Sequence, residues 1–390
     1  MNGADLVAAT GAFTRLYGRK PTVVAFAPGR ANLVGEHTDY NGGFVLPFAL
    51  HLGVTFLAAP RDDDRVRLRT EAYDAGVEFR AGPEPGIGAQ VWASYLRGVV
   101  AGFYRAGIAT GGFDALVVTD LPPGAGLSSS AALEVSCATA LEGLCGKRLS
   151  QRDKARLCHQ AEHEFAGVPC GIMDQFISVM AEPGHLLLID CASEETRQIA
   201  FSGEEMAVLV VDSGLPHELA RGGLARRRDE CERAAEALGV VTLRELDATA
   251  FETAAAGLDP VLYRRASHVI SENRRTLAAA AALETADWQG LGRILAEGHV
   301  SQRQDFESTC PEIDWLVRFA HDDIGPGGGV LGSRMTGGGF GGSTISLVEG
   351  PRADEIGIRI EQAYRDLLGR DCTWFVARPS AGCRLLETAG

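Results

Sequence analysis

A cluster of ionisable and hydrogen-bonding side chains lies near the N-terminus, in the stretch Pro-Gly-Arg-Ala-Asn-Leu-Val-Gly-Glu-His-Thr-Asp-Tyr-Asn-Gly-Gly of residues 28–43. Arg30, Glu36, His37 and Asp39 lie among turn-forming residues there. We predict a loop rather than a buried strand, because buried charges need partners that these could not all find. Apolar runs on both sides predict two flanking strands, and a polar loop held between strands is a usual place for ligand binding. A solvated turn with incidental charges is the alternative.

A second segment, Leu-Pro-Pro-Gly-Ala-Gly-Leu-Ser-Ser-Ser-Ala-Ala at 121–132, combines glycines with three hydroxyl groups. A helix is expected to follow over 131–144. The unpaired N–H groups and the dipole of a helix N-terminus attract anions, and phosphate is the usual one. No lysine follows the glycines, so the Walker pattern is absent. A capped helix after a tight turn is the other interpretation.

A third segment, Arg-Met-Thr-Gly-Gly-Gly-Phe-Gly-Gly-Ser-Thr at 334–344, satisfies the spacing Gly337-x-Gly339-x-x-Gly342 of dinucleotide-binding proteins. That fingerprint requires a following helix, whereas residues 343–348 alternate with β-branched side chains as a strand does. The context therefore disfavours a dinucleotide fold. The dense glycines of the loop 337–342 still indicate positive φ angles or a close approach of the backbone.

A fourth segment, at 160–176, contains Glu162, the turn Pro-Cys-Gly at 169–171 and Asp174 before an apolar helical stretch. An aspartate at the start of a helix is either an N-cap or a functional carboxylate. The residues of this segment alone leave both interpretations open.

Taken together, the four segments resemble the galactokinase family, a branch of the GHMP small-molecule kinase superfamily, in their order and distance. The resemblance covers essentially the whole chain. It implies a two-domain α+β fold, consistent with helices and strands that are mixed rather than strictly alternating. The first domain, 1–203, would resemble ribosomal protein S5. The second, 204–390, would be ferredoxin-like and contain the glycine loop 337–342, with the active site in the cleft between them.

The activity implied by the resemblance is ATP-dependent phosphorylation of the anomeric hydroxyl of D-galactose, giving galactose 1-phosphate and ADP. Asp174 would accept the proton of that hydroxyl, and Arg30 would stabilise the transferring phosphoryl group and keep Asp174 ionised. Ser130 and Glu162 match the family positions that hold Mg²⁺, which prefers oxygen ligands. The residues that would bind the nucleotide are Gly124, Gly126, Leu127, Ser128, Ser129, Ser130 and Trp92. Those that would bind the sugar are Glu36, His37, Asp39 and Gly171.

Three positions keep competing interpretations. His37 is equally suited to a structural hydrogen bond, and Trp92 to the core. At Leu224 the family has a tyrosine that touches the sugar, seven residues before Cys231. Loss of one neutral hydrogen bond changes binding by about 0.5–1.5 kcal/mol, so the chain could prefer another pyranose as a sugar-1-kinase. A non-catalytic galactose and ATP sensor is disfavoured, because the phosphate loop, Arg30 and Asp174 are intact.

Composition fits an ordinary enzyme. With 390 residues, the chain is longer than a single core usually grows, which favours two domains. A net charge of −14 disfavours nucleic acid and anionic membranes as partners. There is no long apolar run and no basic start typical of a secretory signal. Nine cysteines without C-x-x-C pairs suit the reducing cytoplasm. We expect a cytoplasmic monomer whose partners are a small sugar and MgATP.

The elements expected to position these segments follow from periodicity and from the breaks between apolar runs. Residues 79–90 are expected to form a loop, and the charged stretch 193–205 is the expected domain boundary. Strands are expected at 23–27, 44–59, 115–119, 186–189, 206–212, 343–348 and 372–376. Helices are expected at 4–17, 92–105, 131–144 and 353–368, and helices are expected to dominate 224–239, 260–300 and 311–320.

Overall fold

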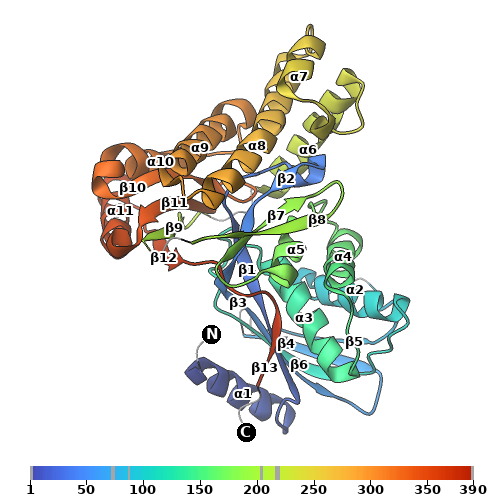
Figure 1. Cartoon of the computed structure of the whole chain (residues 1–390). Coiled ribbons are helices and arrows are strands. Elements are labelled where there is room, and N and C mark those ends of the chain that lie inside the picture. Colours follow the sequence, from blue (N-terminus) through green and yellow to red (C-terminus); the bar gives the residue numbers. More distant parts are fainter. Residues whose placement is uncertain (1–2, 72–74, 87, 203–204, 216–219, 388–390) are drawn as a thin grey trace.

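The structure is a computed structural model that describes residues 3–71, 75–86, 88–202, 205–215 and 220–387. Two larger β-sheets and a small one are joined to eleven α-helices within these ranges (Figure 1). Helices and strands are mixed in order, with mostly antiparallel strand pairs. The predicted α+β class is therefore confirmed.

A six-stranded sheet forms the lower part of the molecule in Figure 1. Its strand order is β13-β1-β3-β6-β4-β5, with only β4 and β6 parallel among the neighbouring pairs. Side chains alternate between its faces, so that Val24 and Leu57 pack with one cluster and Ala25 and Phe56 with another. The strands are β1 (Val23–Asn32), β3 (Pro47–Pro60), β4 (Arg65–Thr70), β5 (Ala75–Arg80), β6 (Phe113–Thr119) and β13 (Arg384–Leu386).

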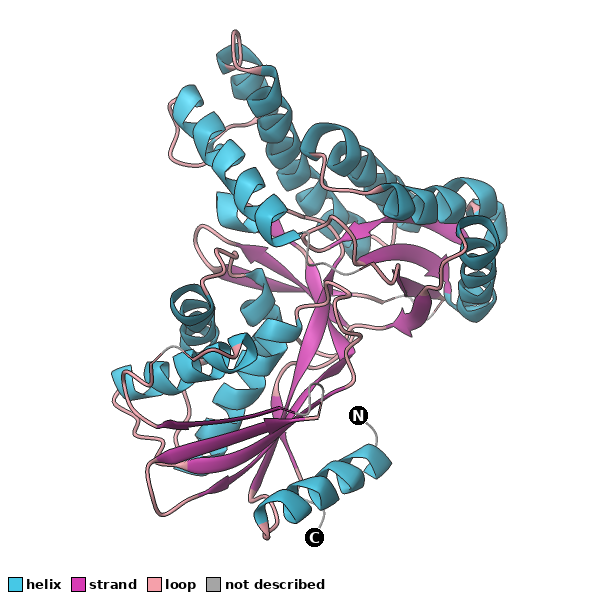
Figure 2. Ribbon diagram, turned by 180° about the vertical axis from the view of Figure 1, so that it is seen from behind, coloured by secondary structure: helices cyan, strands magenta, loops and turns pink. Residues whose placement is uncertain are grey.

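Helices cover both faces of this sheet. α1 (Gly3–Tyr17) buries Phe13 against the face that carries Val24 and Leu57, and Figure 2 shows this helix, next to the N-terminus, apart from the others. Four further helices cover the second face of this sheet. They are α2 (Val91–Arg105), α3 (Ser129–Cys145), α4 (Gln151–Ala161) and α5 (Met173–Met180). Among them, α3 follows the phosphate loop and α5 carries Asp174, and both lie next to β1.

A second, four-stranded sheet has the order β10-β11-β9-β12 and is antiparallel throughout. Ile356, Ile360 and Tyr364 of α11 pack against Leu209 and Val211 of β9. The strands are β9 (Met206–Asp212), β10 (Val330–Thr336), β11 (Ser343–Glu349) and β12 (Thr373–Ala377). The accompanying helices are α9 (Trp288–Ser301), α10 (Pro311–Arg318) and α11 (Ala353–Leu368).

A small sheet and a helical arm complete the fold. The small sheet pairs β2 (Phe44–Val45), β7 (His185–Asp190) and β8 (Glu195–Ala200). The arm, in the upper part of Figure 1, is formed by α6 (Ala220–Leu238), α7 (Ala248–Ala254) and α8 (Pro260–Glu284), which share a core of their own. Short 3-10 helices are η1 (Asp39–Asn41), η4 (Leu243–Glu245), η7 (Pro326–Gly328) and η8 (Gly350–Arg352). π-Helical turns are η2 (Glu162–Ala166), η5 (Gln302–Phe306) and η6 (Phe319–Ile324).

The structure corrects two sequence predictions. β1 continues through Arg30 to Asn32 as a buried strand, so the first part of the polar segment 28–43 is not a loop. The prediction was wrong because the buried charge of Arg30 does find partners, which lie far away in sequence. The predicted loop 79–90 was also wrong at its start, because β5 extends through Arg80.

The two-domain division stays a prediction. Its boundary between residues 203 and 204 lies outside the described residues. The charged stretch 193–205 contains β8, and β13 near the C-terminus pairs with β1 of the first sheet. Among the described helices, none combines the length and the apolar character that crossing a membrane requires.

Candidate active site

A two-point ion pair between Arg30 and Asp174 lies at the centre of the site. Arg30 Nε donates to Asp174 Oδ1 at 2.7 Å, and Nη2 donates to Oδ2 at 2.9 Å. The hydroxyl of Ser128 also donates to the Asp174 carboxylate. Ile172 occupies the N-cap position of α5, so Asp174 is not the helix cap. A paired, largely buried carboxylate beside the serine loop is suited to chemistry rather than to capping.

The predicted phosphate loop lies against β1 at this ion pair. Gly124 and Gly126 have φ angles of 74° and 73°, and Ser128 is left-handed at 58° immediately before α3 begins. Arg30 holds the loop by two contacts, from its backbone N to Leu127 O at 3.1 Å and from Nη1 to Gly126 O at 2.8 Å. The N-terminus of α3 therefore lies beside Asp174 and Arg30, where a phosphate group would be attracted.

The glycine loop 337–342 closes against the phosphate loop. Ser343 Oγ donates to Ala125 O at 2.8 Å, and a Cβ added to Gly337 would lie only 3.0 Å from Gly126 O. The loop joins the antiparallel strands β10 and β11 rather than a strand and a helix. This topology excludes the dinucleotide fingerprint.

Asp39 and Gly171 approach one another closely near Asp174. A Cβ added to Gly171 would lie 2.0 Å from Asp39 Oδ2, so only glycine leaves room for this carboxylate. Burial and, to a smaller extent, the nearby charge of Asp174 raise the pKa of Asp39 to about 6. Asp39 and Asp174 thus face a common region with a carboxylate each.

Glu36 is part of a buried triad that sequence reasoning did not find. Arg334 is fully buried, forms an ion pair with Glu36 and donates from Nη2 to Glu272 Oε1 at 2.7 Å. Burial raises the pKa of Glu36, whereas the pKa of Glu272 is lowered, because Arg334 and Arg275 outweigh its burial. Within the described part of the chain, Glu36 Oε1 has no hydrogen-bond partner. A hydroxyl group of a ligand would satisfy that oxygen.

His37 and Trp92 keep both of their interpretations. His37 has a φ of 66°, its Nδ1 lies 3.0 Å from the hydroxyl of Tyr40, and its ring stacks on Phe306 at 4.4 Å between centroids. Trp92 is half-buried at the start of α2, packs against the main core and donates from Nε1 to Gln90 Oε1 at 2.9 Å. These contacts position the rings of His37 and Trp92 and do not show whether either ring binds a ligand.

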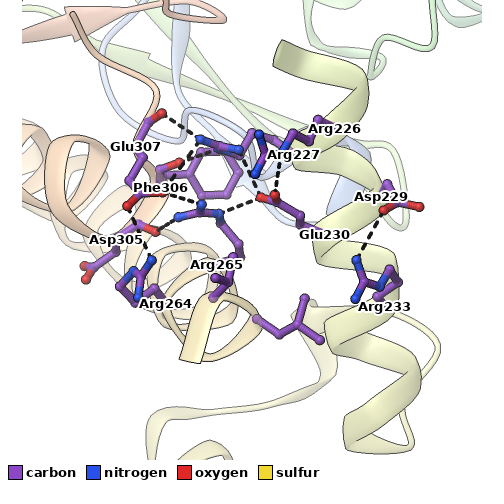
Figure 3. Close-up of polar contacts among 12 residues, drawn as sticks. Arg226, Arg227, Asp229, Glu230, Arg233, Arg264, Arg265, Asp305, Phe306 and Glu307 are labelled. Carbon is purple, nitrogen blue, oxygen red and sulfur yellow. Dashed lines mark hydrogen bonds and ion pairs between the residues drawn. The ribbon is translucent and has the colours of Figure 1, made fainter. Parts of the chain in front are cut away.

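An ionic network contacts the backbone at Phe306 (Figure 3). Arg227 of α6 donates from Nε to Phe306 O at 2.5 Å. Glu230 joins Arg227 to Arg265 of α8, with Oε2–nitrogen distances of 3.0 and 2.7 Å. Arg227 Nη2 also donates to the carbonyl of Glu307, a residue with a φ of 53°. The helical arm therefore fixes the turn on which His37 rests.

Carboxylates gather next to the phosphate loop. Glu162 is hydrogen-bonded to the hydroxyl of Ser130 and accepts from Gln175 Nε2 at 2.7 Å. The same Gln175 nitrogen donates to Glu134 Oε2 at 3.0 Å. Burial raises the pKa of Glu162, and it raises the pKa of Glu134 well above the ordinary value of a glutamate. Ser130 and Glu162 offer the hard oxygen atoms that suit Mg²⁺, so their arrangement fits that ion.

Glu134 was missed by sequence reasoning, although a signal existed. It follows Ser130 by four residues on α3, so both side chains lie on the same face of the helix.

Comparison with known proteins first identifies the class of enzyme to which the chain is similar. The family model of the GHMP kinases N-terminal domain matches residues 94–182, and that of the GHMP kinases C-terminal domain matches 279–366. The fold and the site thus define a GHMP-class small-molecule kinase. The galactokinase galactose-binding signature matches residues 11–60, and human galactokinase is 43% identical over 98% of this chain and 97% of its own length. The chain belongs to the galactokinase family.

Further relatives agree with this family. Dog galactokinase is 42% identical over 99% of this chain and 97% of its own length. A crystal structure of Lactococcus lactis galactokinase in complex with galactose has a TM-score of 0.93 at 30% identity, covering 98% of this chain and all of that one. Methanococcus jannaschii mevalonate kinase, with a TM-score of 0.65 at 18% identity, covers 93% of this chain and 99% of its own and shares the fold alone. The protein is an enzyme that phosphorylates galactose with ATP.

Proposed function

We propose that this member of the galactokinase family transfers the γ-phosphoryl group of ATP to the anomeric hydroxyl of D-galactose, giving galactose 1-phosphate and ADP, as a cytoplasmic monomer. The observation that carries the proposal is the Arg30–Asp174 pair, in which Arg30 contacts the phosphate loop and Asp174 lies near the carboxylate of Asp39. A nucleotide on one side and a sugar on the other would meet at Asp174. Phosphoryl transfer demands mainly such positioning and the neutralisation of charge.

Asp174 is proposed as the proton acceptor for the attacking hydroxyl. Its carboxylate already accepts from Ser128 and Arg30, so its oxygens are oriented before the sugar arrives. Arg30 carries a fixed positive charge at the same place and would stabilise the negative charge that develops on the transferring phosphoryl group. Asp174 would therefore accept the proton, and the adjacent Arg30 would stabilise the charge.

The backbone of the phosphate loop is proposed to hold the nucleotide phosphates. Gly124 and Gly126 have positive φ angles, which glycine adopts more readily than other residues. The N-terminus of α3 adds its partial positive charge to the site. Trp92 is proposed to lie beside the adenine. The residues assigned to the nucleotide are Gly124, Gly126, Leu127, Ser128, Ser129, Ser130 and Trp92.

Sugar recognition is assigned to Glu36, His37, Asp39 and the backbone of Gly171. The free oxygen of Glu36 and the carboxylate of Asp39 would accept hydrogen bonds from sugar hydroxyls. Such directional bonds distinguish epimers, because a misplaced hydroxyl leaves a buried acceptor unpaired. Arg334 forms an ion pair with Glu36, and Asp39 lies where any side chain at position 171 would collide with it.

Mg²⁺ is proposed to be held by Ser130 and Glu162 when the nucleotide binds. A bound Mg²⁺ supplies neutralisation of phosphate charge. Gln175 keeps the carboxylate of Glu162 in place by donating to it. The protein atoms that contribute are thus the hydroxyl of Ser130 and a carboxylate oxygen of Glu162.

Leu224 supports a second candidate, a sugar-1-kinase that prefers a different pyranose. Leu224 is half-buried near the start of α6, and the neighbouring Gly223 packs closely on the ring of Phe340 in the glycine loop. A leucine there removes the hydroxyl contact that the family tyrosine makes. A non-catalytic sensor is disfavoured, because Arg30, Asp174 and the phosphate loop are joined by hydrogen bonds.

The position of the transferred phosphate tests the proposal. The purified enzyme is incubated with galactose, ATP and Mg²⁺, and the product is analysed by ³¹P and ¹H NMR. We expect a single sugar phosphate whose phosphorus couples to the anomeric proton. A phosphate on another hydroxyl, or ATP hydrolysis without a sugar phosphate, would overturn the proposed transfer.

A further inference from the structure

Two histidines and a cysteine converge next to the proposed Mg²⁺ ligand Glu162. His159 and His163 lie where α4 passes into the π-helical turn η2, and Cys170 lies in the turn before α5. One potential ligand atom of each, two ring nitrogens and Sγ, lies within 4.8 Å of the others. The two imidazole rings are 4.3 Å apart between centroids. The segment carrying Cys170 thus folds back onto a pair of histidines.

The types and spacing of these residues suit a soft divalent ion. Histidines at positions i and i+4 of a helix present their rings on the same side, as in zinc sites. Zn²⁺ binds imidazole nitrogen and thiolate sulfur at about 2.0–2.3 Å in a tetrahedral arrangement, which places neighbouring ligand atoms about 3.5 Å apart. The present separations, up to 4.8 Å, exceed that value, so the three side chains must move closer together to hold the ion. Three protein ligands leave a fourth position for water.

A purely structural role explains only part of this arrangement. Nε2 of His159 and Nε2 of His163 lie 3.2 and 2.8 Å from the carbonyl oxygen of Cys170, so the rings hold the turn in place. That clamp needs the carbonyl group of Cys170 and not its side chain. The thiol is nevertheless directed to the same region, where it donates to Glu162 Oε2 at 3.3 Å.

We propose that His159, His163 and Cys170 form a binding site for a thiophilic divalent metal ion of the Zn²⁺ type, and that its occupation inhibits the kinase. On binding, the Cys170 S–H bond breaks, its proton passes to the solvent, and a sulfur–metal bond forms. The hydrogen bond from Cys170 to Glu162 is then lost. Movement of Cys170 also strains the adjoining Gly171 against Asp39. The inhibitory part rests on the proposed roles of Glu162 and Gly171, whereas the binding part does not.

Cobalt is the probe for the site, because Co²⁺ takes the same ligands as Zn²⁺ and absorbs light. The full-length protein, free of chelators and added thiols, is titrated with Co²⁺ and followed by absorption. A thiolate-to-cobalt charge-transfer band and visible bands typical of four-coordinate cobalt are expected, saturating at one ion per chain. Zn²⁺ should displace the cobalt and remove the bands.

Matched variants assign the bands to these residues. Cys170→Ser should abolish the charge-transfer band, and His159→Gln should weaken Co²⁺ binding by at least about tenfold. Cys145→Ser alters another half-buried cysteine outside the cluster and should leave the spectrum unchanged. Absence of a charge-transfer band in the unaltered protein, or its survival in Cys170→Ser, would overturn the proposed site.

Inhibition is measured separately, with galactose, ATP and excess Mg²⁺ at buffered free Zn²⁺. Zn²⁺ should suppress turnover in the unaltered enzyme, and His159→Gln should require at least about tenfold more Zn²⁺ for the same fractional loss of its own Zn²⁺-free rate. Equal sensitivity of both proteins would overturn the inhibitory role, even where the cobalt spectrum supports the site. Failure of the galactokinase assignment itself would be visible without Zn²⁺, as a lack of galactose phosphorylation.

Discussion

Arg30 and Asp174 share a two-point ion pair although 144 residues separate them in the chain, with nitrogen–oxygen distances of 2.7 and 2.9 Å. The third nitrogen of the guanidinium donates to Gly126 O, so one side chain joins the first sheet, the phosphate loop and α5. Only arginine has the fork of donors that such an arrangement requires. The position of the proposed proton acceptor is thus fixed relative to the proposed nucleotide site.

Replacement of the proposed proton acceptor should separate chemistry from binding. Asp174→Asn preserves the size of the side chain but removes its charge, so kcat should fall by about 10²–10⁴ while the fold and nucleotide binding are retained. Asp354→Asn changes an exposed aspartate in the first turn of α11 and serves as the matched control. Steady-state kinetics and nucleotide titration provide the measurement. A near-normal kcat in Asp174→Asn would require another proton acceptor.

The close contact of Gly171 with Asp39 predicts a substrate-binding defect. Gly171→Ala would place a methyl group 2.0 Å from Asp39 Oδ2, so the carboxylate must move. We expect the KM for galactose to rise at least tenfold, a change of about 1.4 kcal/mol, with a smaller effect on the KM for ATP. Gly82→Ala, where an added Cβ meets open space, is the control. Equal galactose KM values in the two variants would remove Asp39 from the sugar site.

Galactose binding should depend on pH through the two buried carboxyl groups. Burial raises the pKa of Asp39 to about 6 and that of Glu36 to about 7. Both groups are therefore protonated at pH values where ordinary carboxyls are still ionised, and a protonated carboxyl accepts hydrogen bonds poorly. The KM for galactose should rise as the pH falls through these values. Asp39→Asn should bind galactose weakly, and its KM for galactose should no longer change with pH near pH 6. An unchanged pH profile in this variant would contradict the assignment of Asp39 to the sugar site.

Leu224 tests the fit of the sugar. If it lines the sugar site, Leu224→Tyr adds a hydroxyl contact and should lower the KM for galactose by up to about tenfold, with little change in kcat. If the site instead suits a bulkier or less polar sugar, the tyrosine should raise the KM for that sugar and do little for galactose. Kinetics across several sugars distinguish the two outcomes. No effect on any sugar would place Leu224 outside the site.

Much of the site could be predicted because its segments are local in sequence. The glycines and serines of 121–132 encode a left-handed turn before a helix by themselves, and the glycines of 337–342 encode close backbone approach. The strand after the second loop was evident from its alternating β-branched residues. These features depend on neighbours within a few residues, which a sequence displays directly.

The buried charges could not be predicted in the same way. Glu36 is paired with Arg334 and Glu272, and Arg30 with Asp174, through contacts between distant parts of the chain. A charge in an apolar stretch looks exposed until its partner is known, which is why the buried end of β1 was interpreted as a loop. The pairing of β13 with β1 is likewise a long-range contact without a local signal.

Discrimination between galactose and glucose tests the central claim most directly. ADP release is measured with MgATP and either free sugar, because glucose differs from galactose only in the orientation of the C4 hydroxyl. The account predicts a kcat/KM for galactose at least about 10² higher, since a site built to pair a hydroxyl rejects its misplacement. Equal values for the two sugars, or no activity with galactose, would contradict it.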